Sequence, residues 1–242
     1  MLAILKRWWS AAAPKPGLHG IEQWARAKGA SWRRVRDDEG FVIDGAHRGV
    51  AWRLEWGPSH RPYIAGSELR CIAELGLHRD LQLMVLNRLL MESSEKKVYD
   101  EYVEGVQTRI DTQTPTEIRW LVMYSKLSAS ELRSLGVRFG GVASVKPWLL
   151  AWLSGPLSDA LLDAARYLAE TDAFVLSIAR GRLSMRLVMR DPQPERLQGW
   201  LELFETAIDE ARRVAGEWRD SALPGASTRP SVWPRDEAGP TE

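Results

Sequence analysis

Three histidine–arginine pairs are the residues of this chain whose types and spacing could do chemistry. They are His47-Arg48, His60-Arg61 and His78-Arg79. Arginine offers a planar fork of donors to a phosphate or carboxylate, and a histidine near neutral pH can donate alongside it. The pairs therefore predict anion binding. The alternative is that they are only the polar, exposed residues that turns commonly carry.

The surrounding sequence predicts the strands and turns that position these pairs. Val50, Trp52, Leu54 and Trp56 alternate with less apolar residues, which is the pattern of a strand with one buried face. Similar runs lie on either side, so residues 41–86 are predicted to form an antiparallel meander. Because successive turns of a meander lie at opposite ends of its sheet, the first and third pairs would share one end and the second pair would lie at the other.

The loop after Trp56 is a second candidate for the anion site. Pro58 and Pro62 flank the second pair and would stiffen the loop. We expect this loop to hold Arg61 and Tyr63 outward, where a ligand could reach them together with His60.

Other chemistry is not indicated by the sequence. The four histidines are scattered and there is one cysteine, so no metal site is predicted. No glycine-rich phosphate loop, nucleophile elbow or nucleotide fingerprint is found, so neither a cofactor nor catalytic residues are predicted. The sequence favours a non-catalytic binding module whose partner is a protein or a small anionic ligand. The alternative is an enzyme acting on an anionic small molecule, with His47, Arg48, His78 and Arg79 lining its pocket.

Composition narrows the class of protein. The chain has 242 residues and a formal net charge of +1, which argues against broad, salt-sensitive binding to nucleic acid. The single cysteine, Cys71, lies on the apolar side of an alternating run and is predicted to be buried. We expect a cytoplasmic protein, because one cysteine cannot form an internal disulfide. The 12 tryptophans are expected to supply core and interface mass.

The N-terminal segment could contact a membrane surface or a partner. No apolar run is long enough for a spanning helix. The candidate contact residues are Leu2, Leu5, Trp8 and Trp9, with two basic residues between them. A packed or fraying N-terminal helix and a targeting role are the alternatives.

The predicted fold class is α+β, with antiparallel meander sheet or sheets flanked by helices. We expect an N-terminal segment and linker (1–16), an α+β unit with the meander (17–112), an α+β unit with a hairpin and a long C-terminal helix (113–220), and a disordered tail (221–242). The stretches FVIDGAHRGVAWRLEW and FVLSIARGRLSMRLVM both open with Phe-Val and contain Arg-Gly. A duplication of α-ββ-α units would explain this, although any two amphipathic hairpins share alternation.

Several local features give narrower expectations. Asp44-Gly45 is a dipeptide typical of hairpin turns. Residues 118–124 alternate and contain aromatic and β-branched side chains, which favours a strand, although a capping box at residues 114–117 favours a helix. Gly140-Gly141 is interpreted as a loop. An apolar stripe after Pro194 predicts a helix that reaches Trp218.

Overall fold

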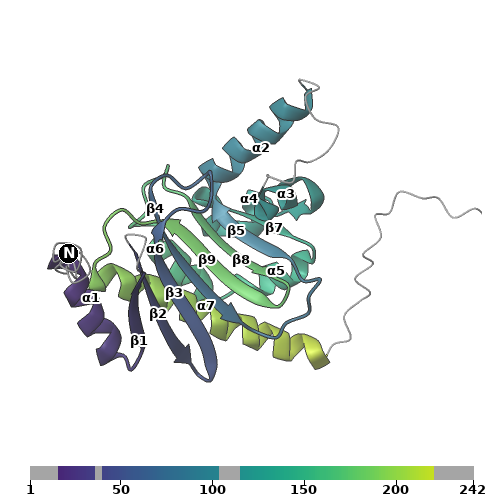
Figure 1. The fold of residues 1–242 in the computed structure, drawn as a ribbon. Helices are drawn as coiled ribbons and strands as arrows, with labels where there is room; N and C mark the ends of the chain where they lie inside the picture. The colour runs from purple at the N-terminus through teal and green to yellow at the C-terminus, as the bar shows by residue number, and fades with distance from the viewer. Residues whose placement is uncertain (1–15, 36–39, 104–114, 221–242) are drawn as a thin grey trace, which may run out of the picture.

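The computed structural model describes residues 16–35, 40–103 and 115–220 (Figure 1). The strands are β1 (Ser31–Val35), β2 (Gly40–His47), β3 (Val50–Pro58), β4 (Ser67–Glu74), β5 (Leu83–Asn87), β6 (Ser125–Lys126), β7 (Phe139–Ala143), β8 (Phe174–Ala179) and β9 (Arg182–Val188). The helices are α1 (Pro16–Ala27), α2 (Arg88–Val103), α3 (Thr116–Met123), α4 (Ala129–Leu132), α5 (Lys146–Trp152), α6 (Pro156–Ala164) and α7 (Pro194–Asp220), with a 3₁₀ helix, η2 (Arg133–Val137), after α4.

The described strands form one sheet of nine strands in the order β1-β2-β3-β4-β9-β8-β5-β7-β6. Every neighbouring pair in it is antiparallel. The fold is therefore α+β, as predicted. The meander is confirmed for β2, β3 and β4, but β9 and β8 lie between β4 and β5. Strands from both predicted units thus share one sheet, and the division of the chain into two units stays a prediction.

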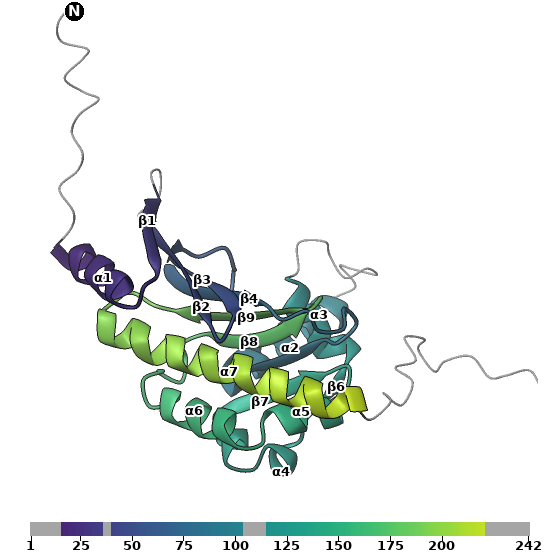
Figure 2. The same cartoon turned by 90° about the horizontal axis from the view of Figure 1, so that it is seen from below.

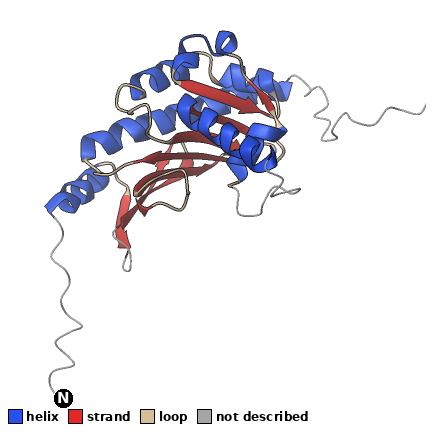
Figure 3. Ribbon diagram, turned by 90° about the horizontal axis from the view of Figure 1, so that it is seen from above, coloured by secondary structure: helices blue, strands red, loops and turns tan. Residues whose placement is uncertain are grey.

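The two faces of the sheet are covered differently. Side chains of β2, β3, β4, β8 and β9 that alternate towards one face form a large core with α1, α5, α6 and α7. Figure 2 shows α7 running along the sheet with α5 and α6 beside it, and Figure 3 shows the strands as one layer with helices packed against it. On the opposite face α2 and α3 form a smaller core with β5, β7 and β8. Among the described helices none packs on this second face over β3, β4 and β9, which we call the uncovered face.

The strand predicted at residues 118–124 is wrong, because these residues belong mostly to α3. Ile118, Trp120 and Leu121 are buried, whereas Val122 and Met123 are 58% and 59% exposed. This is the pattern of one helical face and not of alternating strand faces. Pro115 occupies the N-cap position, so the chain enters the helix from an extended conformation.

The predictions of a loop at Gly140-Gly141 and of a hairpin turn at Asp44-Gly45 are also wrong. Gly140 and Gly141 lie inside β7, where a side chain on the first would collide with Met91 and on the second with Leu127. Glycine is needed here because side chains of other elements pack closely against both faces of the strand. Asp44 and Gly45 lie inside β2, and the β2–β3 turn is instead at Arg48-Gly49, whose φ angles of 46° and 81° are both positive.

The β2–β3 and β8–β9 hairpins resemble each other at their turns. Arg180-Gly181 connects β8 to β9 with φ angles of 53° and 80°, like the pair in the first hairpin. However, Phe41 is one residue further from its turn than Phe174. A shift of one residue reverses the face to which a strand residue points. The residue before the turn, His47 in the first hairpin, therefore points towards α7, whereas its counterpart Ala179 in the second hairpin points to the other face. Duplication stays a prediction.

The ring of Trp52 requires a glycine opposite it on β2. A Cβ atom built on Gly45 would collide with this buried indole. We predict that Gly45→Ala lowers the free energy of unfolding by about 2 kcal/mol through overpacking. Gly199→Ala, on the exposed side of α7 with no atom within 4 Å of the new methyl group, should raise it by roughly 0.5 to 1 kcal/mol. Urea denaturation measures both, and a neutral Gly45→Ala would contradict this packing.

Candidate anion-binding site

The sheet register separates the three histidine–arginine pairs as the meander predicts. His47 and Arg48 lie at the β2–β3 turn, and His78 and Arg79 follow β4 at the same end of the sheet. The remaining pair lies in the β3–β4 loop at the opposite end. A shared end does not make a shared site, because each pair contacts different neighbours.

The first pair is bound by carboxylates of α7. His47 Nε2 lies 3.0 Å from Asp209 and its Nδ1 lies 3.6 Å from Glu205. Arg48 Nη1 lies 3.2 Å from Asp209, and Arg212 donates to the backbone carbonyl of Arg48. These contacts fasten the hairpin turn to α7. They also place two carboxylates beside the pair, and these would repel an external anion.

The third pair lies on an exposed turn. His78 Nδ1 accepts from the backbone N–H of Asp80 and lies 3.9 Å from its carboxylate. Arg79 is exposed. The assignment of these residues to an anion site stays a prediction.

The β3–β4 loop folds onto the uncovered face of the sheet, so the expectation that it holds Arg61 and Tyr63 outward is wrong. Ile64 is buried in the smaller core and anchors the loop. Ser59 Oγ donates to the carbonyl of Arg61 and accepts from its backbone N–H, both at 3.0 Å, which closes a tight turn. The loop thereby directs Arg61 and Tyr63 towards α3.

A buried carboxylate of α3 receives both of these side chains. Glu117 Oε1 accepts from Arg61 Nε and from the Tyr63 hydroxyl, each at 2.5 Å. Burial alone would raise the pKa of Glu117, but the Tyr63 hydrogen bond and the charge of Arg61 together bring it below its ordinary value. Burial, followed by the charge of Glu117, raises the pKa of Tyr63. Glu117 is therefore ionised and Tyr63 neutral near neutral pH.

A second buried carboxylate lies on β4. Glu68 is 0% exposed, and its Oε1 accepts from Arg186 Nη1 of β9 at 2.7 Å. Its Oε2 lies 3.3 Å from Ser59 Oγ, whose one hydroxyl hydrogen is shared between this oxygen and the carbonyl of Arg61. Arg70 Nε lies 3.3 Å from both Glu68 and Glu55, without a hydrogen bond to either among the described residues. Arg70 also contacts the imidazole of His60. Arg70 and Arg186 are directly opposite each other in the register of β4 and β9, and the carboxylate of Glu68 offsets their repulsion.

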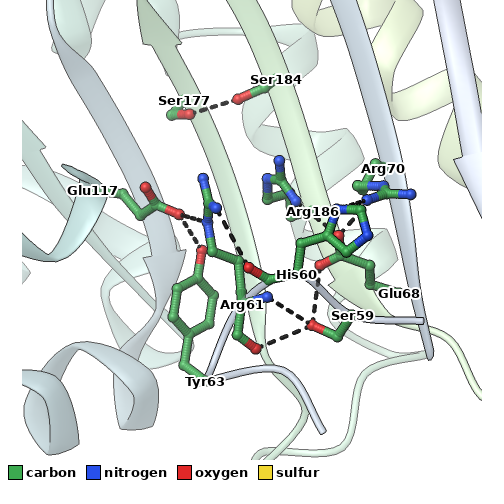
Figure 4. Close-up of polar contacts among 10 residues, drawn as sticks. All are labelled: Ser59, His60, Arg61, Tyr63, Glu68, Arg70, Glu117, Ser177, Ser184 and Arg186. Atoms are coloured by element: carbon green, nitrogen blue, oxygen red, sulfur yellow. Dashed lines mark hydrogen bonds and ion pairs between the residues drawn. The ribbon is translucent and has the colours of Figure 1, made fainter. Parts of the chain in front are cut away.

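Two serine hydroxyls complete the arrangement. Ser177 of β8 and Ser184 of β9 are cross-strand partners whose Oγ atoms lie 2.9 Å apart. In Figure 4 the guanidinium groups of Arg61 and Arg186 extend towards this serine pair. Arg61 donates through Nε to Glu117 and through Nη1 to the carbonyl of His60, and Arg186 donates through Nη1 to Glu68. No described residue accepts a hydrogen bond from Nη2 of either arginine. We call Arg61, Arg186, Ser177 and Ser184 the oxyanion cluster.

The loop residues of this region are conspicuous in the sequence, but its strand residues are not. Arg70, Arg186, Glu68 and the two serines occupy polar positions of alternating strands, which ordinarily face water. One feature of the sequence pointed to Glu68 and Arg186: the residues that alternate with them are strongly apolar, which is typical of strands in the middle of a sheet.

Other expected and candidate features lie elsewhere. Leu2, Leu5, Trp8 and Trp9 are outside the described residues. Cys71 is a free, buried thiol whose pKa is raised by burial. A hollow of about 100 Å³ near Arg88 and Arg138 is bordered by guanidinium groups that donate to the backbone carbonyls of Gly136, Ala165 and Leu168.

None of the described helices has the length and apolar character required to cross a bilayer. Within the same residues, no group of three histidine, cysteine or acidic side chains is placed to ligate a metal ion.

Comparison of the chain with protein families, with curated proteins and with solved structures found no match.

The ionised state of Glu117 makes stability depend on pH. Because its pKa is lower in the folded chain than the ordinary value of 4.5, its contribution is present above that value and is lost as the pH falls through the folded-state pKa. We predict that Glu117→Gln costs about 2 kcal/mol at pH 7 and that the cost shrinks on acidification. Denaturation between pH 7 and pH 3 measures this, with exposed Glu92→Gln as the control. A cost that does not change with pH would contradict the assignment.

Proposed function

We propose that this protein is a non-catalytic binding module that holds a small oxyanion, a carboxylate or a phosphate, at the oxyanion cluster on the uncovered face. The observation that carries the proposal is the convergence of Arg61 and Arg186 on the serine pair, with each guanidinium fixed on one edge by a buried carboxylate. A guanidinium held in this way loses little further side-chain freedom when it binds a ligand.

The charge arrangement supports anion binding although the cluster's ion pairs are balanced. Side-chain exposure is 29% for Arg61 against 10% for Glu117, and 19% for Arg186 against 0% for Glu68. The carboxylates therefore lie beneath the guanidinium groups. A ligand approaching from solvent would meet donors first, and interactions in this partly desolvated setting are stronger than in bulk water.

The arrangement of the serines supports binding over turnover. Nucleophilic catalysis by serine requires a base within hydrogen-bond reach of the hydroxyl. Ser177 and Ser184 instead contact each other, and among the described residues neither has a hydrogen bond to a histidine or a carboxylate. We also propose a cytoplasmic location and a ligand other than nucleic acid, supported by the single buried thiol and the near-balanced charge.

The proposal predicts saturable binding of inorganic phosphate or acetate. Two charge-assisted contacts would give a dissociation constant on the order of 1 mM, about −4 kcal/mol. Arg186→Lys keeps a positive charge beside Glu68 but removes the planar fork, so affinity should fall about fivefold with the fold preserved. Ser184→Ala should weaken binding about threefold without touching an ion pair. Isothermal titration calorimetry at constant ionic strength measures both variants.

Arg166→Gln is the matched control, because Arg166 is an exposed arginine just after α6, on the opposite side of the sheet. It should bind like the unsubstituted chain. If all three variants bind phosphate and acetate equally, or if binding does not saturate, the oxyanion cluster is not the site.

A further inference from the structure

Arg182 lies on the same strand and the same face as Arg186 of the oxyanion cluster. Arg182, Ser184 and Arg186 alternate along β9 with core residues, so all three face the uncovered side of the sheet. Arg182 and Arg186 are four residues apart, which separates their Cα atoms by about 13 Å. Strand β9 therefore presents a cation at each end of one line, with a hydroxyl between them.

The surface between the two arginines has no carboxylate in the strand register. Ser184 lies between Ile72 of β4 and Ser177 of β8, and Arg182 lies between Glu74 of β4 and Ala179 of β8. Ile72 and Ala179 are partly exposed. The middle of the line thus offers apolar and hydroxyl contacts, while its ends offer guanidinium groups.

The partner of Arg182 can be exchanged at small cost. Arg182 Nε donates to Glu74 Oε1 at 2.7 Å, but the two side chains are 55% and 65% exposed. Exposed ion pairs contribute little to stability because water competes with them. A ligand carboxylate could take the place of Glu74 without disturbing the fold. By contrast, Arg186 is fastened to the fully buried Glu68.

This inference rests on the proposed function and names the ligand class of that site. We propose that the ligand is an elongated dianion with an apolar body, lying along β9 with one anionic group at the oxyanion cluster and the other at Arg182. Joining the two anionic groups in one molecule makes the second contact intramolecular, so a weak exposed arginine adds to affinity and to selection by length.

A length series of dicarboxylates tests this proposal. Calorimetry at constant ionic strength compares butanedioate, hexanedioate, octanedioate, decanedioate and dodecanedioate with the monocarboxylate of each length. The monocarboxylates separate the gain from the apolar body from the gain of the second charge. We expect the longer dicarboxylates to bind about tenfold more tightly than their monocarboxylate counterparts, and the shortest to show no such advantage.

Two exposed substitutions locate the second contact. Arg182→Gln should abolish the advantage of long dicarboxylates and leave monocarboxylate binding unchanged. Glu74→Gln removes the competing carboxylate and should increase that advantage about threefold. Both side chains are largely exposed, so both variants are expected to fold, and thermal unfolding checks this.

The outcomes separate this inference from the proposed function. If monocarboxylates bind through Arg186 but long dicarboxylates bind no better, or if Arg182→Gln leaves their advantage intact, the dianion proposal is overturned and the oxyanion cluster stands. If no carboxylate or phosphate binds at all, both proposals fail.

Discussion

The buried carboxylate of Glu68 is the constraint on which the uncovered face depends. Removing an ionised carboxylate from water costs several kcal/mol, so it must be matched by nearby cations and donors. Arg186 and Ser59 hydrogen-bond to it, and Arg70 lies beside it. Through these contacts one side chain ties together β4, β9 and the β3–β4 loop. The guanidinium groups cannot turn freely into solvent, because doing so would leave Glu68 unpaired.

The packing on the other face makes this arrangement rigid. Leu69 and Cys71 of β4 and Met185 of β9 are almost completely buried in the core that α7 covers. Since neighbouring residues of a strand point to opposite faces, the positions of Glu68, Arg70 and Arg186 are fixed by the burial of the residues beside them. A site built on central strands of a packed sheet holds its geometry better than a site built on loops. The loop that contributes Arg61 is itself fastened by Ile64 and Glu117.

The sequence predicted the elements that apolar alternation and helical periodicity can specify. Strands β2, β3, β4, β8 and β9 and the long helix α7 follow from apolar patterns. The order of the strands does not follow from local patterns, because the insertion of β9 and β8 beside β4 depends on pairing between distant segments.

The misplaced elements and the missed site have the same physical cause, which is contact between residues that are far apart in the sequence. Gly140 lies in a strand at a position that needs glycine, because Met91 packs where a side chain would be. Helix α3 buries one helical face although its apolar residues alternate in the sequence. Glu68 and Arg186 are 118 residues apart, so nothing local marks them as partners. The histidine–arginine pairs were conspicuous in the sequence because turns are polar. Of their three arginines, Arg61 is the one that the proposed site includes, because its loop folds onto the uncovered face.

The most direct test is NMR observation of the arginine guanidinium signals during a titration with phosphate, with Nε–H read for Arg61 and Nη–H for Arg186, the groups that donate to Glu117 and Glu68. If buried carboxylates hold Arg61 and Arg186 ready for an anion, their signals should be sharp and protected from solvent exchange before phosphate is added. They should then shift together along one saturable curve, while the signal of Arg166 stays in place. Signals of Arg61 and Arg186 that exchange as fast as that of Arg166, or that shift only linearly with phosphate, would contradict the account.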